Sequence, residues 1–387
     1  MSIRIESKKD CCGCTACESI CSHKAISMHS DTLGFLYPEV DINKCTECGL
    51  CRKVCQFKED YLRYDNFPQP KAYSMRLKET EQLSRSQSGG AFFQLADFII
   101  QGGGVVYGAA FDADWKVSHS KATNNIELES LRMSKYVQSD MKDTFHRVRN
   151  DLRQGITVLF SGTACQVAGL KSFIPKNLHT NLICIDIICH GVPSPKIWAD
   201  YIGYLQHKHN SKITKACFRD KRFGWHGAKE SFMFANGKEV FSQTSNHLYF
   251  SGYTMRESCS NCHYTNTKRV GDITVGDHWG LPKDSPYEKD ALGVSLVLAN
   301  SDKGCDLLNK VLHKFHYEEV DLKECLQPQL KYPSKQNPSH ASFVADYKAN
   351  GFLYIAKKYS DLGIRWKIKA IYTHLRRWLD PVIRMFR

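Results

Sequence analysis

The sequence predicts an α+β or mixed α/β protein in which a small cysteine-rich module precedes a larger α/β domain. Three observations indicate this fold class. Cysteines crowd into two short runs within residues 11–55. Strand-like and helix-like segments then alternate from residue 91 onward. A chain of 387 residues, 42% of them hydrophobic, is also long enough for two or three domains with sizeable cores.

The two cysteine runs, "CCGCTACESIC" and "CTECGLCRKVC", repeat one spacing, C-x2-C-x2-C-x3-C. This spacing is typical of 4Fe-4S ligation in which three thiolates of a run hold one cluster and the fourth reaches the other cluster. The first expected cluster is held by Cys11, Cys14, Cys17 and Cys55. The second expected cluster is held by Cys21, Cys45, Cys48 and Cys51. Cys12 is left over, and a pair of zinc knuckles is the alternative.

Residues 1–64 thus resemble a bacterial dicluster 4Fe-4S ferredoxin domain. Ser22 and Gln56 follow the fourth cysteines, where bacterial ferredoxins usually have proline. This departure weakens a turn preference and leaves the ligands in place. Such a module transfers single electrons, so the rest of the chain must hold the centre that receives them.

The stretch "YLRYDNFPQPKAYSMR" contains Pro68 and Pro70 and is typical of a connector, with a domain boundary near Asp65. Beyond it, "AFFQLADFIIQ" at 91–101 has helical apolar spacing, and "GGG" ends the predicted helix. "VVYGAAF" at 105–111 follows at once and predicts a buried strand.

A second strand, loop and helix are predicted from "ITVLF" at 156–160, a tight "SGT" loop, and "ACQVAGLKSF" at 164–173. "NLICIDIIC" predicts another strand, which "HGVPSP" interrupts. Both small-residue loops, "SGG" and "SGT", precede a helix, where free N–H groups favour an anion such as a pyrophosphate. Neither loop matches a dinucleotide or phosphate-loop fingerprint, so ordinary turn chemistry is the alternative.

Four further cysteines are candidates for a third cluster: Cys165, Cys189, Cys259 and Cys262. Their wide separation leaves the ligand set open, because a C-x-x-C pair also fits zinc or a redox disulfide. The remaining cysteines are expected to be small buried apolar residues: Cys184, Cys217, Cys305 and Cys325.

Several ordered blocks, among them "SKYVQSD", "LFSGTACQVAGLKSF", "DIICHGVPSP", "CSNCHYTNTKRVGDITVGDHWG" and "GVSLVLANSDKG", resemble the beta subunit family of coenzyme F420 hydrogenase and dehydrogenase. The resemblance spans about residues 70–325. It divides the chain after the ferredoxin module into an N-terminal family domain at 65–150 and a C-terminal family domain at 151–345, followed by a tail at 346–387.

Members of this family are iron–sulfur flavoproteins that carry FAD, and the resemblance places Cys165, Cys189, Cys259 and Cys262 where the family binds a cluster. It also implies a set of flavin contacts: Ser88, Gly89, Gly90, Ser161, Gly162, Thr163 and Gln166. His190 and Asp277 beside these blocks are candidates for proton transfer, with helix capping or a structural role as the alternative. Ala164 replaces the proline of the family's G-T-P-C-Q loop, which makes that loop less rigid.

Together these features predict an FAD and iron–sulfur oxidoreductase. Electrons are expected to pass from the ferredoxin module through the third cluster to FAD and a small organic substrate or coenzyme F420, or in reverse, because a flavin joins one-electron to two-electron chemistry. The expected partners are a ferredoxin or another redox protein. A noncatalytic electron-relay subunit is the alternative function.

The formal charge of +13 raises the question of nucleic-acid binding, but the basic residues form no recognised reading motif, so no nucleic-acid partner is expected. No apolar run approaches a membrane span and "MSIRIESKKD" lacks a signal-peptide core, which predicts a cytoplasmic protein. The basic, aromatic tail from Gly363 predicts either an interfacial helix at the inner face of the membrane or a helix packed on protein.

Overall fold

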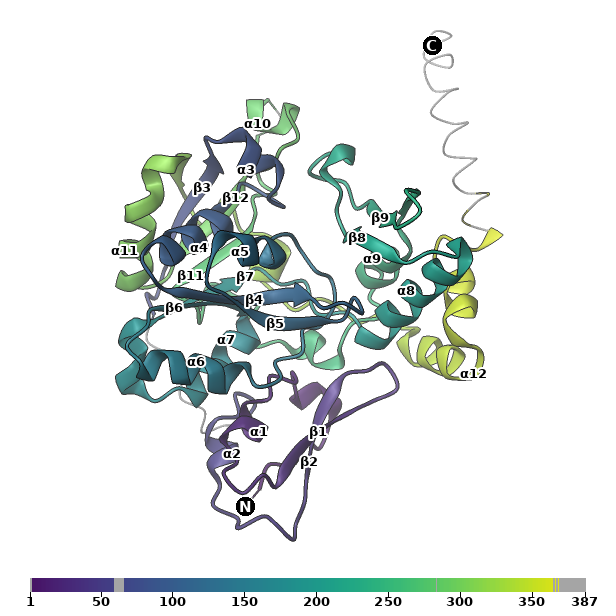
Figure 1. Cartoon of the computed structure of the whole chain (residues 1–387), viewed down its shortest axis with the longest axis horizontal. Helices are drawn as coiled ribbons and strands as arrows, with labels where there is room; N and C mark the ends of the chain where they lie inside the picture. The colour runs from purple at the N-terminus through teal and green to yellow at the C-terminus, as the bar shows by residue number, and fades with distance from the viewer. Residues whose placement is uncertain (1, 59–65, 283, 365, 367, 369–387) are drawn as a thin grey trace.

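The protein is described by a computed structural model that covers residues 2–58, 66–282, 284–364, 366 and 368. The proposed boundary at Asp65 and residues 369–387 of the basic tail lie outside these residues. Figure 1 shows the N-terminal module at the bottom, a large sheet with helices above and below it, and a separate lobe on the right.

The N-terminal module consists of an antiparallel hairpin and two short helices. These elements are β1 (Ile26–Ser30), β2 (Leu36–Val40), α1 (Ala16–Ile20) and α2 (Leu50–Lys53). The two helices pack against each other, and α1 also packs on helix α7 (Ala164–Phe173) of the main domain. Ala16 and Val54 are buried in the same apolar cluster as Phe145 and Leu170, so the module shares a core with the main domain.

The main domain is built on an eight-stranded sheet in the order β13-β3-β12-β11-β7-β6-β4-β5. Its strands are β3 (Lys71–Leu77), β4 (Val105–Phe111), β5 (Val117–Ala122), β6 (Val158–Thr163), β7 (Leu182–Ile187), β11 (Ile273–Asp277), β12 (Ser295–Ala299) and β13 (Phe315–Val320). The four central strands β4, β6, β7 and β11 are parallel, and the outer pairs are antiparallel. This mixed sheet confirms the predicted α/β class.

Helices cover both faces of the sheet (Figure 1). One face carries α4 (Ala91–Gln101), α5 (Asn125–Leu131) and α11 (Asp302–Val311), and the other carries α6 (Thr144–Arg153) and α7. Shorter helices are α3 (Thr80–Ser84) and α10 (Pro286–Lys289).

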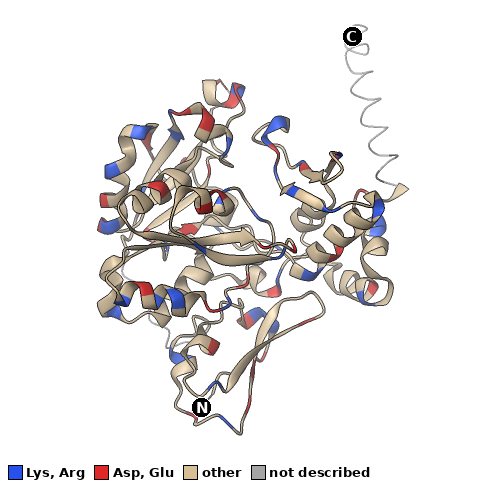
Figure 2. Cartoon of the chain, viewed as in Figure 1, with Lys and Arg blue, Asp and Glu red and all other residues tan. Residues whose placement is uncertain are grey.

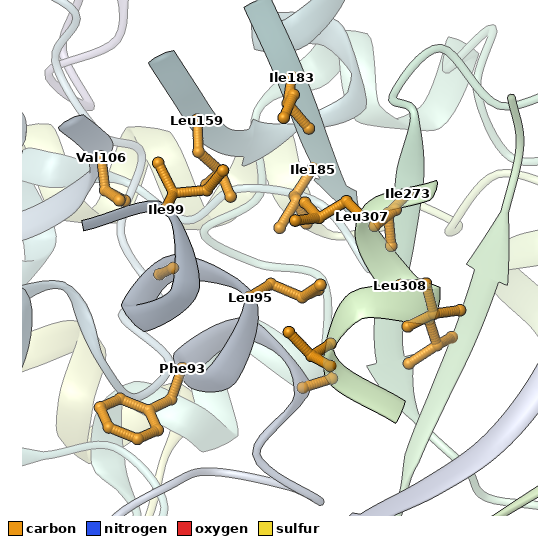
Figure 3. Packing of buried hydrophobic residues seen from close by; sticks show 14 of the residues in the cluster. Phe93, Leu95, Ile99, Val106, Leu159, Ile183, Ile185, Ile273, Leu307 and Leu308 are labelled. Carbon is orange, nitrogen blue, oxygen red and sulfur yellow. The ribbon is translucent and has the colours of Figure 1, made fainter. Parts of the chain in front are cut away.

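The central strands are apolar on both sides because each face is covered by helices. Leu159 points into the cluster of α4 and α11, while Val158 and Phe160 point into the cluster of α6 and α7. Figure 3 shows Leu95 and Ile99 of α4 and Leu307 of α11 in one apolar cluster on the same face of the sheet.

A second lobe follows β7 and contains a three-stranded antiparallel sheet in the order β10-β9-β8. Its elements are α8 (Pro195–His209), β8 (Ile213–Cys217), β9 (Glu230–Phe234), β10 (Glu239–Ser242), α9 (Thr244–Phe250) and α12 (His340–Tyr359). Trp198, Tyr201 and Phe232 form its aromatic core, and Phe35 of the N-terminal module joins the same cluster. The lobe therefore contacts both other parts of the molecule.

Two details differ from the sequence-based expectation. The "SGT" segment is not a tight loop, because Ser161, Gly162 and Thr163 are the last residues of β6 and pair with β7, and α7 begins at the next residue. The strand predicted through Cys189 ends at Ile187, so Cys189 lies in the irregular segment beyond it. The helix at 91–101 and the strand at 105–111 have the predicted bounds.

Charged residues of both signs are interspersed along the described chain (Figure 2). In its described part, no helix has the length and apolar character that crossing a membrane requires.

Candidate redox centres and cofactor cavity

The first cysteine group lies in the N-terminal module around a cavity of about 20 Å³. Its members are Cys11, Cys14, Cys17 and Cys55. Cys17 belongs to α1 and Cys55 follows α2, so the packing of the two helices brings a thiol of the second run to three thiols of the first. Gly13 turns the chain between them with a φ of +68°, which glycine adopts without strain.

The second cysteine group surrounds another cavity of about 20 Å³ at the other end of the module. Its members are Cys21, Cys45, Cys48 and Cys51. Backbone N–H groups donate to two of these sulfurs, from Ala25 to Cys21 over 3.3 Å and from Ile3 to Cys51 over 3.2 Å. Cys48 is exposed, so this group lies nearest to solvent.

The third cysteine group gathers residues from distant segments around a cavity of about 40 Å³. Its members are Cys165, Cys189, Cys259 and Cys262. Cys165 lies in the first turn of α7, Cys189 in the irregular segment after β7, and Cys259 in the short helix η4 (Glu257–Asn261). The N–H groups of Gly191 and Val192 donate to the sulfurs of Cys189 and Cys259 over 3.3 and 3.4 Å.

A buried ion pair holds the segment after Cys262 against the sheet. Arg269 donates from Nη2 to Asp186 Oδ1 of β7 over 2.7 Å, and the two side chains are 2% and 0% exposed. Asp186 also accepts from the N–H of Gly271 over 2.8 Å. The pair therefore fixes the loop that follows the C-x-x-C motif relative to the strand that precedes Cys189.

Burial raises the pKa of several thiols of the first and third groups. The pKa of Cys55 and of Cys262 rises to about 11, and that of Cys259 to about 12. Cys14 and Cys165 differ, because a hydrogen bond from Cys12 lowers the pKa of each thiol, that of Cys14 to about 7. Thiols with a raised pKa are protonated at neutral pH, so metal binding at these groups would release protons.

The thiols of each cysteine group surround a small cavity and do not converge on one point. Among the described residues, no three His, Cys, Asp or Glu side chains converge closely enough to hold one metal ion. A four-iron cluster places its thiolates on separate irons, so it needs ligands spread around a volume.

Cys12, the cysteine left over by the spacing, lies between the first and third groups. It lines both cavities and forms hydrogen bonds with the thiols of Cys14 and Cys165, which raise its pKa. Gln56 reinforces this partition, because its Nε2 donates to Cys12 Sγ over 3.3 Å and to the carbonyl of Cys165 over 2.7 Å. The first and third cysteine groups are thus linked by the hydrogen bonds of Cys12 and Gln56.

A much larger cavity, of about 550 Å³, opens at the ends of the central strands. Its volume is in the range of roughly 300–1,000 Å³ that is typical of cofactor and ligand sites. Most of the predicted flavin contacts line it: Ser88, Gly90, Ser161, Gly162, Thr163 and Gln166. Thr163, Cys189 and His190 line this cavity and the third cysteine cavity at once. The two spaces therefore adjoin.

Gly89 is not among the lining residues. A Cβ atom there would lie 2.1 Å from the carbonyl oxygen of Met75 and 2.5 Å from the nitrogen of Ser295, so glycine is required for the loop to pack on β3 and β12. The side chain of Gln166 lines the cavity but already accepts a hydrogen bond, because it forms a capping box with Thr163 at the start of α7.

The two candidates for proton transfer both line the large cavity but differ in their bonding. His190 accepts at Nδ1 from Gln329 Nε2 over 2.8 Å, and burial lowers its pKa, which favours the neutral ring. Asp277 accepts from Arg219 Nη1 over 2.7 Å and from Trp225 Nε1 over 2.8 Å. Its two carboxylate oxygens are therefore held in place.

Two polar residues of this cavity were not predicted from the sequence. Lys135, within the block "SKYVQSD", donates from Nζ to the carbonyl of Arg132 over 2.7 Å, and forms no ion pair with the described acidic residues. Burial lowers its pKa to about 7. The Oε1 atom of Gln87 is buried at the cavity without a hydrogen-bond partner among the described residues. Neither feature has a signal in sequence spacing.

The other cysteines are dispersed through the structure. Cys184 and Cys325 are buried in apolar clusters, as expected, whereas Cys217 and Cys305 are only half-buried.

Residues 156–324 match the family model that describes the C terminus of the coenzyme F420 hydrogenase/dehydrogenase beta subunit. No curated protein matches the chain. Among solved structures, the chain is similar to a chain from a xenon-derivatization study of the F420-reducing NiFe hydrogenase complex from Methanosarcina barkeri. The identity is 16% and the TM-score 0.47, over 78% of this chain and 97% of that chain.

Proposed function

We propose that the chain is an iron–sulfur flavoprotein oxidoreductase, because residues 156–324 match the family model that describes the C terminus of the coenzyme F420 hydrogenase/dehydrogenase beta subunit. The observation that carries this proposal is a continuous series of neighbouring sites. Cys12 lines the cavities of the first and third cysteine groups, and Cys189 lines that of the third group and the large cavity. Cys51 and Cys17, of the second and first groups, pack in one apolar cluster.

The cysteine groups fit three 4Fe-4S clusters. Each group offers four thiols around a small cavity, and the first two match the crossed ligation of dicluster ferredoxins. Backbone N–H groups donate to sulfurs of the second and third groups, and such hydrogen bonds stabilise thiolates.

The large cavity fits a flavin nucleotide. Gln87 Oε1 is a buried acceptor without a partner among the described residues, and it suits an N–H donor of the flavin ring. Lys135 is a cation without an acidic partner among the described residues, and it suits the negatively charged pyrophosphate. Gly90 and Gly162 have no side chains at the cavity wall, so a planar ring can approach the backbone there.

When bound, the clusters would transfer single electrons and FAD would combine them into two-electron chemistry on a substrate. Within this scheme, His190 is positioned to exchange a proton through Nε2, since its Nδ1 accepts from Gln329. Asp277 orients Arg219 at the cavity wall and is held by Trp225 behind it, which suits a positioning role rather than proton transfer.

The substrate would be a small organic molecule or coenzyme F420, bound in the part of the cavity that FAD leaves open. A ferredoxin or another redox protein would dock at the second cysteine group, where Cys48 is exposed. The series of sites allows electrons to pass in either direction.

The experiment is anaerobic reconstitution with iron, sulfide and FAD, removal of unbound cofactor, and reduction with dithionite. The proposal predicts that FAD stays bound, loses its absorbance on reduction, and regains it when a suitable acceptor such as F420 is added. A protein that binds iron but retains no flavin would instead be a noncatalytic electron-relay subunit.

A further inference from the structure

Arg256 is a buried guanidinium at the junction of the N-terminal module and the main domain. Its exposed fraction is 0%. It donates from Nε to the carbonyl of Cys11 over 2.8 Å, from Nη1 to Gln138 Oε1 over 2.9 Å, and from Nη2 to the carbonyl of Leu36 over 2.8 Å. Nη2 also lies 3.6 Å from the sulfur of Cys11, a member of the first group.

The same side chain borders the third group. Arg256 lines the cavity of Cys165, Cys189, Cys259 and Cys262, and its carbonyl accepts from the N–H of Cys259 over 3.0 Å. Gly13 makes the close approach possible, because a Cβ atom at that residue would lie 2.8 Å from Nη1 of Arg256. The guanidinium is therefore held between two of the three proposed cluster sites.

This charge has no carboxylate partner. Within the described chain, Arg256 forms no ion pair with Asp or Glu, whereas Arg219 pairs with Asp277 and Arg269 with Asp186. Its other neighbours are the rings of Tyr37 and Phe35, with centroids 4.2 and 5.4 Å away. A buried and unpaired cation is unfavourable, so its location indicates that an anion belongs beside it.

We propose that Arg256 is the shared counter-charge of the first and third clusters and raises the reduction potential of both. This inference rests on the proposed function. Each reduction adds one electron to a cluster, supplied by dithionite in the test, and makes the cluster more negative. A fixed cation beside the cluster stabilises the reduced form more than the oxidised form, and so does a hydrogen bond to a ligand sulfur. The second cluster lacks this cation, since Arg256 does not line its cavity.

The test is a redox titration of the reconstituted full chain, followed by electron paramagnetic resonance, in wild type and in two variants. Arg256→Gln removes the charge. Arg256→Lys keeps the charge and loses the planar fork. We expect two of the three midpoint potentials to fall in Arg256→Gln and to fall less in Arg256→Lys. The third should stay unchanged, and its loss in Cys45→Ala would assign it to the second cluster.

If Arg256→Gln does not hold iron, the redox titration of Gln138→Glu provides an independent test. The new carboxylate would lie at the position that Nη1 of Arg256 contacts over 2.9 Å, and would neutralise the cation without removing it. The donation from Gln138 Nε2 to the carbonyl of Cys12 would be lost. The same two potentials should fall.

The outcomes separate this inference from the proposed function. Wild-type protein without iron–sulfur signals would overturn both. Three clusters in wild type, with potentials unchanged in Gln138→Glu and in any iron-loaded Arg256→Gln, would overturn the role of Arg256 alone. A uniform shift of all three potentials would also overturn it, because the effect would then be general rather than local.

Discussion

Gln56 joins the N-terminal module to the main domain by donating a hydrogen bond from Nε2 to the carbonyl of Cys165 over 2.7 Å, across 109 residues of sequence. It occupies the position after Cys55 where bacterial ferredoxins usually have proline. Proline could not make this contact, since its ring carries no donor. The departure from the ferredoxin pattern thus coincides with the place where the module contacts the third cysteine group.

Replacing Gln56 should loosen this junction without removing a ligand. In Gln56→Ala the buried carbonyl of Cys165 and the sulfur of Cys12 lose a donor, which should lower the free energy of unfolding by about 1–3 kcal/mol. Thermal unfolding of reconstituted protein measures this. Gln154→Ala, at an exposed helix end, is the matched control and should change little. Equal effects of the two variants, or loss of iron from Gln56→Ala, would argue against the junction.

The crossed grouping of cysteines can be tested by iron counts in double variants. Cys21→Ala and Cys45→Ala should each lose one cluster, and the double variant should lose no more than either alone, because both residues line one cavity. Cys11→Ala combined with Cys21→Ala should lose two clusters, although both residues belong to the first run. The reverse pattern would mean that each run holds its own cluster. Cys12→Ser should leave the iron count unchanged.

Lys135 should strengthen flavin retention through its charge. Lys135→Met should weaken FAD binding by about tenfold or more, as expected for loss of one charge-assisted hydrogen bond. In wild type, retention should weaken as pH rises through about 7, the pKa of Lys135, because the cation is then lost before FAD binds. Lys116→Met at an exposed site is the control. Ultrafiltration with fluorescence of the released flavin measures both effects, and a pH dependence that persists in Lys135→Met would assign it elsewhere.

Glu230 should make the second lobe less stable as pH rises. It is fully buried beside Tyr201, and burial raises its pKa to about 8 from an ordinary value of 4.5. Between these two pH values the unfolded chain releases a proton that the folded chain retains, so rising pH favours unfolding. Across this window the free energy of unfolding should fall by about 1.4 kcal/mol per pH unit. The stabilising contribution of Glu230 is fully present below it.

Glu230→Gln removes this titration. The difference in melting temperature between Glu230→Gln and wild type should therefore grow from pH 5 to pH 8. Glu319→Gln on the exposed part of β13 is the matched control. A difference that stays constant with pH would show that Glu230 is already ionised in the folded protein.

Prediction from the sequence was most successful where chemistry is local. The helix at 91–101 and the strand at 105–111 follow from apolar spacing and from the glycines between them, and the structure has both. The small residues of the "SGT" segment predict a turn, and this prediction is wrong. Here they extend β6 along β7, where strand pairing outweighs local propensity.

The third cysteine group shows the limit of spacing. The thiols of Cys165, Cys189 and Cys259 come together only because β6 and β7 are parallel neighbours and η4 packs beside their ends, and spacing alone left the set open. Lys135 and Arg256 have no sequence signal at all, since an unpaired buried cation is defined by what surrounds it. Gly89 stays a predicted flavin contact, and in the structure it packs closely against Met75 and Ser295.

We propose that three sets of thiols deliver electrons to a flavin within one chain. The most direct test is elemental and flavin analysis of the full chain after anaerobic purification and reconstitution. We expect about twelve iron atoms and one FAD per chain. Zinc in place of iron, with no bound flavin, would contradict this proposal.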